Sequence, residues 1–394
     1  MDDLKYLMNT YAQEKICFVK GEGVYLWDDQ GKKYLDTSAG IAVMNLGHGH
    51  PEVIETIQKQ AAELMHVSNG TVIPQQLALA KNLTNAAGME KAFLCNCGAE
   101  AVEAALKITR LLGHQRGYKN PKIIVLAGGF HGRTFATISA ANAQINQDLY
   151  SPLMPGFVPC KHNDINALKE VLNNAQEVVA VLLEPIQGEG GVKLLDDGFL
   201  AKVRQACDQH KVFMVLDEVQ TGFGRTGSLY AYQQENITPD IVASAKGLGN
   251  GFPIGICMAK GEAAELFTPG SHGSTFGGNP LACSVGNKVL EIMLRDNIPQ
   301  QSKKIGEYLK NKLNEKLSHL DCIVDIRGKG LMIGVELDRE CVLLRKRALD
   351  DGMVINIAQK KIIRLTPPLI ITKDQCDVVA NKLEKLISDF AANS

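Results

Sequence analysis

Two short apolar stretches between residues 212 and 246 constrain the fold more than any other part of the chain. Val212–Leu216 leads directly into Asp217, and Ile241–Ala243 leads to Lys246. Apolar stretches of this length, bounded by polar and turn residues, are typical of buried strands in a parallel sheet. Open α/β sheets bind ligands at the carboxyl ends of their strands, so we expect Asp217 and Lys246 to face one crevice. The pair therefore predicts an α/β protein with a ligand site at this crevice.

A carboxylate and an amine in one crevice match the requirements of one cofactor. Pyridoxal 5′-phosphate bonds covalently to a lysine and places its pyridine nitrogen against an acid. The alternative is a structural ion pair, which would be the better interpretation for an arbitrary Asp and Lys. The residues around the pair are needed to decide between the two.

Those residues form motifs that resemble a known family. Asp217–Gln220 (DEVQ) is followed by Thr221–Gly227 (TGFGRTG) and later by Ser244–Gly247 (SAKG). These motifs resemble the class III aminotransferases, which are fold-type-I pyridoxal phosphate enzymes, and the acetylornithine-using members look most similar. The resemblance extends from about Val19 to Pro368.

The resemblance implies a fold and a domain organisation. We expect a large domain with a mostly parallel central sheet and a smaller α+β domain built from both ends of the chain. The expected parts are an N-terminal segment (1–50) that packs with the small domain, a pyridoxal-phosphate-binding domain (51–285) and a C-terminal small domain (286–394).

The overall composition excludes several classes of partner. Lys plus Arg (42) nearly balances Asp plus Glu (43). The chain therefore has no basic surplus of the kind that would indicate nucleic acid or anionic lipid as a partner. The longest apolar runs, such as Val178–Leu183, are far too short to span a membrane. The first residues lack the apolar core of a signal peptide, which predicts a cytoplasmic protein.

Metal and disulfide chemistry are not expected either. The ten cysteines form no C-x-x-C pair, so free thiols in a reducing compartment are the simpler interpretation. His48 and His50 are close in sequence, but two histidines without a third ligand are weak evidence for a metal site.

A phosphate site is expected where a short strand meets a helix. Ala92–Cys95 is apolar, and a small-residue turn then leads into a helix that runs to about Leu112. Free backbone N–H groups and the helix dipole make such a helix N-terminus an anion site. An ordinary strand-to-helix connection would look the same, and the resemblance favours the cofactor phosphate. The expected contacts are Cys97, Gly98 and Ala99, although the family usually has Ser where this chain has Cys97, and a thiol is a weak donor.

The resemblance assigns roles to further cofactor-binding residues. Lys246 would hold the cofactor covalently and transfer protons, while Asp217 would keep the ring nitrogen protonated. Phe130 and Val219 would lie on opposite faces of the ring, and Gln220 would meet its hydroxyl group. In this family the loop with Thr275 crosses a dimer interface and donates to the phosphate in the other subunit, which implies a homodimer with shared active sites. We interpret His131 as structural and Glu184 as a supporting residue.

Substrate binding is expected to involve Arg133, Glu189, Ser274 and Arg364. By resemblance, the two arginines grip the two carboxylates of 2-oxoglutarate, and Glu189 pairs with Arg364 while the amino donor is bound. The expected reaction moves the terminal amino group of N-acetylornithine to 2-oxoglutarate, as in arginine biosynthesis. The alternatives are an ornithine or 4-aminobutyrate aminotransferase, a glutamate semialdehyde aminomutase, or a pyridoxal-phosphate-binding protein without turnover.

One motif points to a different cofactor and is rejected. Gly222–Gly227 matches G-x-G-x-x-G, the dinucleotide-binding pattern. That pattern should open a helix directly after its strand, whereas Asp217–Thr221 intervene here and no helix signal follows. We therefore do not expect nicotinamide binding.

Other elements follow from periodicity and turn residues. A helix from Pro51 should place Val53, Ile57, Ala61 and Leu64 on one apolar face. Residues 144–165 contain three prolines and predict a long surface loop. Helices are expected at Leu281–Arg295 and Lys303–Leu317, and a hairpin around residues 327–330. Thr372 and Gln375 form a capping box for the last helix, whose expected apolar face is Val379, Leu383, Leu386 and Phe390.

Overall fold

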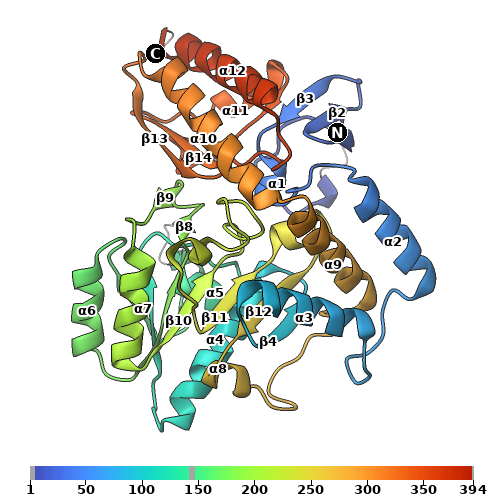
Figure 1. Ribbon diagram of the computed structural model, residues 1–394. Coiled ribbons are helices and arrows are strands. Elements are labelled where there is room, and N and C mark those ends of the chain that lie inside the picture. The colour runs from blue at the N-terminus through green and yellow to red at the C-terminus, as the bar shows by residue number, and fades with distance from the viewer. Residues whose placement is uncertain (1–4, 142–146, 393–394) are drawn as a thin grey trace.

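A seven-stranded sheet forms the centre of the larger of two lobes in the computed structural model, which describes residues 5–141 and 147–392 (Figure 1). Its strand order is β4-β12-β11-β10-β7-β5-β6. The strands are β4 (Lys91–Cys95), β5 (Lys122–Leu126), β6 (Phe157–Cys160), β7 (Val178–Leu183), β10 (Phe213–Asp217), β11 (Ile241–Ser244) and β12 (Gly255–Ala259). β12 runs antiparallel to both of its neighbours, and the other pairings are parallel. The predicted, mostly parallel sheet is confirmed.

Helices cover both faces of this sheet, which explains why its central strands are apolar throughout. Every residue of β7, β10, β11 and β12 is buried. Ile123 and Val125 of β5 share a core with α4, whereas Ile124 and Leu126 share the core of the opposite face. The helices of this lobe are α2 (Pro51–Glu63), α3 (Pro74–Ala87), α4 (Gly98–Gln115), α5 (Phe135–Ala140), α6 (Ile165–Asn174), α7 (Phe199–His210), α8 (Glu262–Glu265) and α9 (Pro280–Arg295).

The parallel pairing of β10 and β11 brings Asp217 and Lys246 to one edge of the sheet. Asp217 is the last residue of β10 and is in register with Ala243 of β11. Lys246 follows β11 at the start of the short 3-10 helix η4 (Lys246–Leu248). Both residues therefore lie at the carboxyl ends of adjacent strands.

The smaller lobe contains two four-stranded sheets. The first has the order β13-β14-β17-β16 and is antiparallel, with β13 (Ile323–Lys329), β14 (Met332–Leu337), β16 (Asn356–Ala358) and β17 (Ile362–Leu365). The helices of this lobe are α10 (Ile298–Leu317), α11 (Leu344–Asp350) and α12 (Lys373–Ala392). The predicted hairpin is confirmed, as is the capping box, in which the Gln375 side chain accepts from Thr372 N and Thr372 Oγ1 accepts from Gln375 N.

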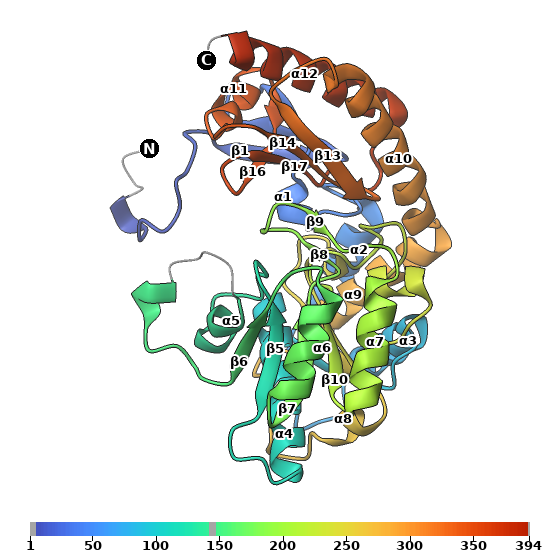
Figure 2. The same ribbon diagram turned by 90° about the vertical axis from the view of Figure 1, so that its left-hand side faces the viewer.

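The beginning of the chain forms the second sheet of this lobe. Its order is β1-β2-β3-β15, with β1 (Phe18–Glu22), β2 (Tyr25–Asp28), β3 (Lys33–Asp36) and β15 (Met353–Val354). β3 pairs in parallel with β15, so Leu35 lies beside Met353. Figure 2 shows the N-terminal strand β1 beside the C-terminal elements in the upper lobe. Residues from the two ends of the chain thus build one structural unit.

Arg225 connects the two lobes. Its guanidinium group is fully buried and donates to the carbonyl oxygens of Leu331 (2.9 Å) and Pro367 (2.5 Å) and to Asn45 Oδ1 (2.6 Å). Burial lowers the pKa of Arg225 to about 9. Gly222–Gly227, which was rejected as a nucleotide motif, forms turns rather than the start of a helix, and its arginine joins the lobes.

The structure corrects three predictions about secondary structure. Residues 157–160 form a strand, β6, where a loop was predicted; β6 is at the edge of the sheet, where Pro159 costs no central hydrogen bond. Residues 144–146 of that predicted loop lie outside the described residues. In α2, Val53 is buried as predicted, but Ala61 and Leu64 are exposed. α10 begins at Ile298 rather than Lys303, because Pro299 is accommodated in its first turn.

Five further short elements complete the described chain: α1 (Ala39–Ala42), β8 (Ile186–Gln187), β9 (Lys193–Leu194) and the 3-10 helices η2 (Gln147–Tyr150) and η3 (Ala231–Glu235). All four residues of α1 have positive φ angles, from 49° to 66°. No helix among residues 5–141 and 147–392 is long and apolar enough to cross a membrane.

Candidate active site

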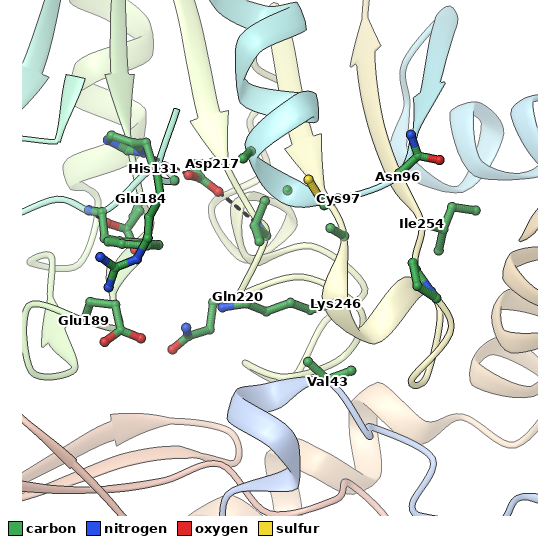
Figure 3. Close-up of a pocket in the computed structure, with 18 of the residues that line it drawn as sticks. Val43, Asn96, Cys97, His131, Glu184, Glu189, Asp217, Gln220, Lys246 and Ile254 are labelled. Carbon is green, nitrogen blue, oxygen red and sulfur yellow. Dashed lines mark hydrogen bonds and ion pairs between the residues drawn. The ribbon is translucent and has the colours of Figure 1, made fainter. Parts of the chain in front are cut away.

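A cavity of about 470 Å³ lies at the carboxyl ends of the parallel strands. Figure 3 shows Asp217, Gln220 and Lys246 around one space, with His131 and Glu189 on one side and Cys97 and Asn96 on the other. Ten of the predicted site residues line it, namely Cys97, Gly98, Ala99, Phe130, Arg133, Glu189, Asp217, Val219, Gln220 and Lys246. The other three, Ser274, Thr275 and Arg364, are not in its lining, and their positions are described below.

Asp217 is held in place by two hydrogen bonds. Its Oδ2 lies 2.8 Å from His131 Nδ1, and its Oδ1 accepts from the backbone N–H of Val219 at 3.0 Å. His131 is buried and lines the cavity, so its interpretation as structural extends to a positioning role for Asp217. Burial disfavours a charged imidazole, but the hydrogen bond and charge of Asp217 outweigh burial and raise the pKa of His131. The raised pKa favours the charged imidazole next to the Asp217 carboxylate.

Glu184, which follows β7, supports the loops around the cavity. Its Oε1 accepts from the backbone N–H of Phe130 at 2.8 Å, and its Oε2 accepts from that of Gly188 at 3.4 Å. Burial raises the pKa of Glu184 to about 7. These bonds fix the loops that carry Phe130 and Glu189, in agreement with its predicted supporting role.

Lys246 has the properties of a reactive amine. Burial, followed by the positive charge of Arg364, lowers the pKa of Lys246 to about 8, although Glu189, Asp217 and Glu184 act in the opposite direction. A lysine with an ordinary pKa near 10.4 is almost entirely protonated at neutral pH. A pKa near 8 leaves a far larger fraction of Lys246 unprotonated and able to act as a nucleophile or base.

The N-terminus of α4 forms the opposite end of the cavity. Cys97 is the N-cap residue, its backbone is extended, and its side chain makes no capping hydrogen bond. Gly98 begins the helix, and a Cβ atom there would lie 2.7 Å from Val219 Cγ1. Glycine at position 98 therefore leaves room for the Val219 side chain beside the start of α4. The first N–H groups of α4 have no partner within the helix, so this end of the helix can accept an anion through its backbone.

Ser274 lies next to this anion site although it does not line the cavity. Ser274 Oγ accepts from Asn96 Nδ2 at 3.1 Å and from the Gly277 N–H at 3.0 Å. Asn96 also donates twice to Glu100 Oε2. The bonds of Ser274 thus tie its loop to the turn before α4, while Thr275 is exposed at the surface.

Arg364 of the smaller lobe contacts two residues that line the cavity. Its Nη1 donates to Glu189 Oε1 at 2.7 Å and to Gln220 Oε1 at 3.3 Å, and its Nε donates to Asn356 Oδ1 at 3.0 Å. The Arg364 side chain is 1 % exposed, whereas that of Glu189 is 34 % exposed. The buried cation is therefore neutralised by a carboxylate that has room to move. Asn356, which the sequence reasoning missed, is the cross-strand neighbour of Arg364.

Arg133 supplies a second guanidinium group at the cavity. It is exposed, and its Cζ lies 5.8 Å from the centre of the Phe130 ring. Within the described part of the chain, no carboxylate forms an ion pair with it. Arg133 is thus available to bind an anion from solution.

The other two histidines singled out in the sequence do not line the cavity. His48 Nε2 lies 2.8 Å from Asp36 Oδ2, and His50 is the N-cap residue of α2. Among residues 5–141 and 147–392, no three His, Cys, Asp or Glu side chains gather as a metal site would require.

The site combines a reactive amine, a fixed carboxylate, apolar lining from Phe130 and Val219, a helix N-terminus and two guanidinium groups. An enzyme with these groups can bond covalently to a flat, phosphorylated aromatic aldehyde and can act on acidic substrates. The fold and the site therefore define an enzyme of pyridoxal phosphate chemistry.

Comparison with known proteins identifies the family. The model of the class-III aminotransferase family matches residues 6–387, and the chain belongs to this family. The acetylornithine aminotransferase of Nitrosomonas europaea is 44 % identical over 98 % of both chains, and that of Aquifex aeolicus is 43 % identical over 98 % of this chain and 100 % of its own. The resemblance predicted from the motifs is confirmed.

Solved structures agree with this assignment. The ornithine aminotransferase from Toxoplasma gondii ME49 superposes with a TM-score of 0.95 at 30 % identity, covering 100 % of this chain and 95 % of its own. The acetylornithine aminotransferase from Elizabethkingia anophelis superposes with a TM-score of 0.90 at 34 % identity, covering 98 % of this chain and 97 % of its own.

The chain is thus a pyridoxal-phosphate-dependent aminotransferase. The residues present fit this cofactor, because the amine of Lys246 and the carboxylate of Asp217 line one cavity with the N-terminus of α4. His131 strengthens the fit, since its bond to Asp217 holds the carboxylate that would lie against the ring nitrogen.

Proposed function

We propose that this enzyme transfers the terminal amino group of N-acetylornithine to 2-oxoglutarate. The observation that carries the proposal is the bond between Glu189 and Arg364 beside an unpaired Arg133. A site for two differently charged substrates needs one permanent cation and one cation that can be neutralised. The relatives that are 40–44 % identical over almost the whole chain are acetylornithine aminotransferases, which supports this donor.

Cofactor binding is proposed to use residues from several strands and from the partner subunit. When bound, pyridoxal phosphate supplies an electron-accepting ring that stabilises negative charge on the substrate carbon. Asp217 would hold the ring nitrogen protonated, with Phe130 and Val219 on the two ring faces and Gln220 at the hydroxyl. The proposed phosphate contacts are Cys97, Gly98, Ala99 and the partner's Thr275.

Lys246 is proposed to bond to the cofactor and then to carry the proton during transfer. Its pKa of about 8 lets the amine accept a proton and release it again near neutral pH. Lys246 starts η4 with a φ of 47°, a conformation that few side-chain-bearing residues adopt. This backbone directs the amine from the end of β11 into the cavity (Figure 3).

Glu189 is proposed to act as a gate on Arg364. An amino donor that reacts through its terminal amine has no carboxylate beside the reacting carbon, so Glu189 would neutralise Arg364 during this half-reaction. An unpaired buried cation would be costly. When 2-oxoglutarate enters, its carboxylate would take the place of Glu189, and Arg133 would bind the second carboxylate.

The gate is tested by comparing half-reactions in single turnover. We expect Glu189→Ala to raise the rate with glutamate as donor relative to the rate with N-acetylornithine, because Arg364 becomes free for an α-carboxylate. Arg364→Ala should slow the 2-oxoglutarate half-reaction more than the N-acetylornithine half-reaction. A desolvated charged hydrogen bond contributes about 1.5–3 kcal/mol, so ratios should change by roughly 10- to 100-fold.

One result would contradict the gating role of Glu189. If Glu189→Ala leaves the ratio of donor rates unchanged, Glu189 does not gate this site. A panel with ornithine and 4-aminobutyrate as donors, compared by kcat/KM, then separates N-acetylornithine from the alternative donors. The high structural similarity to an ornithine aminotransferase makes ornithine the second candidate.

We also propose a homodimer with shared active sites. Exposed apolar side chains surround the loop of Thr275, namely Leu64, Met65, Val72, Leu77 and Phe276. They form one region, because Asn69 donates to the Ser274 and Gly277 carbonyls and the His66 ring lies 5.4 Å from that of Phe276. A surface of this kind is typical of subunit interfaces. Light scattering on the cofactor-loaded protein gives the mass that tests the dimer.

A reducing compartment, the cytoplasm, is the proposed location. All ten cysteines are free, and eight of them are buried in the cores. Oxidising compartments favour disulfide formation. Fractionation of cells followed by immunodetection tests this location.

A further inference from the structure

The turn that carries Glu189 is held from both sides. It joins β8 to β9 and spans residues 188–192, three of which are glycine. Gly188 N–H donates to Glu184 Oε2 at 3.4 Å, and Arg327 Nη2 of the smaller lobe donates to the Gly191 carbonyl at 2.6 Å. A glycine-rich turn has little conformational preference of its own, so such contacts decide its conformation.

One hairpin of the smaller lobe binds Glu189 at two points. Figure 2 shows β8 and β9 at the border of the larger lobe, facing the smaller lobe that contains β16 and β17. Arg364 on β17 binds the Glu189 carboxylate at 2.7 Å, and Gln359 in the hairpin turn donates from Nε2 to the Glu189 carbonyl at 2.7 Å. The side chain and the backbone of Glu189 are therefore positioned by the same element.

The conformation of Gln359 is unfavourable for a residue with a side chain. Gln359 and Lys360 have φ angles of 48° and 62°, in the left-handed region that favours glycine. The two side chains have different partners: Gln359 binds the Glu189 turn, whereas Lys360 Nζ pairs with Glu340 at 3.1 Å. Strained residues often mark functional positions, and the amide of Gln359 gives a reason for a non-glycine residue here.

We propose that Gln359 is a positioning residue for the gate: its amide fixes the Glu189 backbone so that the carboxylate points at Arg364. This inference rests on the proposed gating role of Glu189. With the backbone held, opening is a rotation of the Glu189 side chain alone. Without the amide, the carboxylate leaves Arg364 more often, and the site becomes more receptive to dicarboxylates.

The test uses glutarate, which has the two carboxylates of 2-oxoglutarate but lacks the reactive carbonyl. Glutarate binding to the cofactor-loaded enzyme is measured by calorimetry for wild type, Gln359→Met, Lys360→Met and Glu189→Ala. Gln359→Met keeps the length of the side chain but removes the donor. Because the net effect of one neutral hydrogen bond corresponds to roughly two- to tenfold in an equilibrium, we expect Kd for glutarate to fall by about that factor.

The other variants separate the possible outcomes. Lys360→Met changes the adjacent left-handed residue and should leave Kd unchanged, and Glu189→Ala should lower Kd at least as much as Gln359→Met. The single-turnover rate with glutamate, relative to N-acetylornithine, should rise in Gln359→Met. If Glu189→Ala tightens glutarate but Gln359→Met does not, or if Lys360→Met has the same effect, Gln359 does not position the gate. If Glu189→Ala itself leaves Kd unchanged, the gate is wrong and this inference fails with it.

Discussion

The surroundings of single residues determine their basicity and orientation in this site, as Lys246, Asp217 and His131 show. Lys246 loses part of its basicity because it is buried close to the charge of Arg364. Asp217 keeps its orientation because His131 and the Val219 N–H hold both of its oxygens. The amine is therefore poised to react, and the carboxylate is held in one orientation.

The lowered pKa of Lys246 leads to a prediction about cofactor capture. Only the unprotonated amine can bond to the cofactor, so the capture rate of the cofactor-free enzyme should rise with pH and reach half its maximum near pH 8. Stopped-flow absorbance from pH 6 to 10 measures it. A free-lysine peptide as control should show a midpoint above pH 10.

Lys246→Ala provides the matching control for that experiment. It should bind the cofactor without a covalent bond and lose steady transamination. Borohydride reduction followed by peptide mapping should find the label on Lys246 in the wild type. A midpoint above pH 10, or a label on another lysine, would contradict the assignment.

Cys97 carries a second prediction at this scale. Its thiol makes no capping bond at the start of α4, and a hydroxyl is a stronger donor than a thiol. Cys97→Ser should therefore bind the cofactor as tightly as the wild type or up to about tenfold more tightly, because a neutral hydrogen bond contributes roughly 0.5–1.5 kcal/mol. Equilibrium dialysis of the cofactor measures this. Binding weakened by more than tenfold would show that Cys97 is not at the phosphate.

Elements with strong periodicity or clear end signals were predictable from the sequence. The apolar runs that became β7, β10 and β11 are buried throughout, and the capping box of α12 is present. The four apolar residues expected to face the core from α12 are all buried. In each case local sequence and burial favour the same structure.

Elements that depend on distant partners were not predictable. β6 contains Pro159 and is a strand only because β5 offers an edge. The left-handed φ angles of Ala39, Ile41 and Ala42 have no signal in an Ala-Gly-Ile-Ala sequence. Likewise, His131 and Gln359 are recognised only through their bonds to Asp217 and to the Glu189 turn, 86 and 170 residues away.

At the scale of the whole molecule, Arg225 determines how firmly the lobes are joined. A lysine at position 225 cannot make all three hydrogen bonds of the guanidinium group, and each buried acceptor left without a partner costs about 1–3 kcal/mol. Arg225→Lys should therefore weaken the association of the two lobes by roughly 2–5 kcal/mol.

Urea unfolding with two probes tests this loss. Trp27, the single tryptophan, reports on the smaller lobe by fluorescence, and the absorbance of the bound cofactor reports on the larger lobe. The two transitions should separate in Arg225→Lys. In Arg339→Lys, which changes an exposed arginine, they should coincide with those of the wild type. Coincident transitions at the wild-type midpoint in Arg225→Lys would show that Arg225 does not join the lobes.

The parallel pairing of β3 with β15 has a consequence for biosynthesis. Leu35 emerges from the ribosome long before its neighbour Met353 is made. At about 5–20 residues per second, the first strands wait for roughly 15–60 s without their sheet partner. All strands of the seven-stranded sheet lie within residues 91–259 and are complete earlier. The larger lobe can therefore fold during translation, while the smaller lobe closes later, when β15 becomes available to β3.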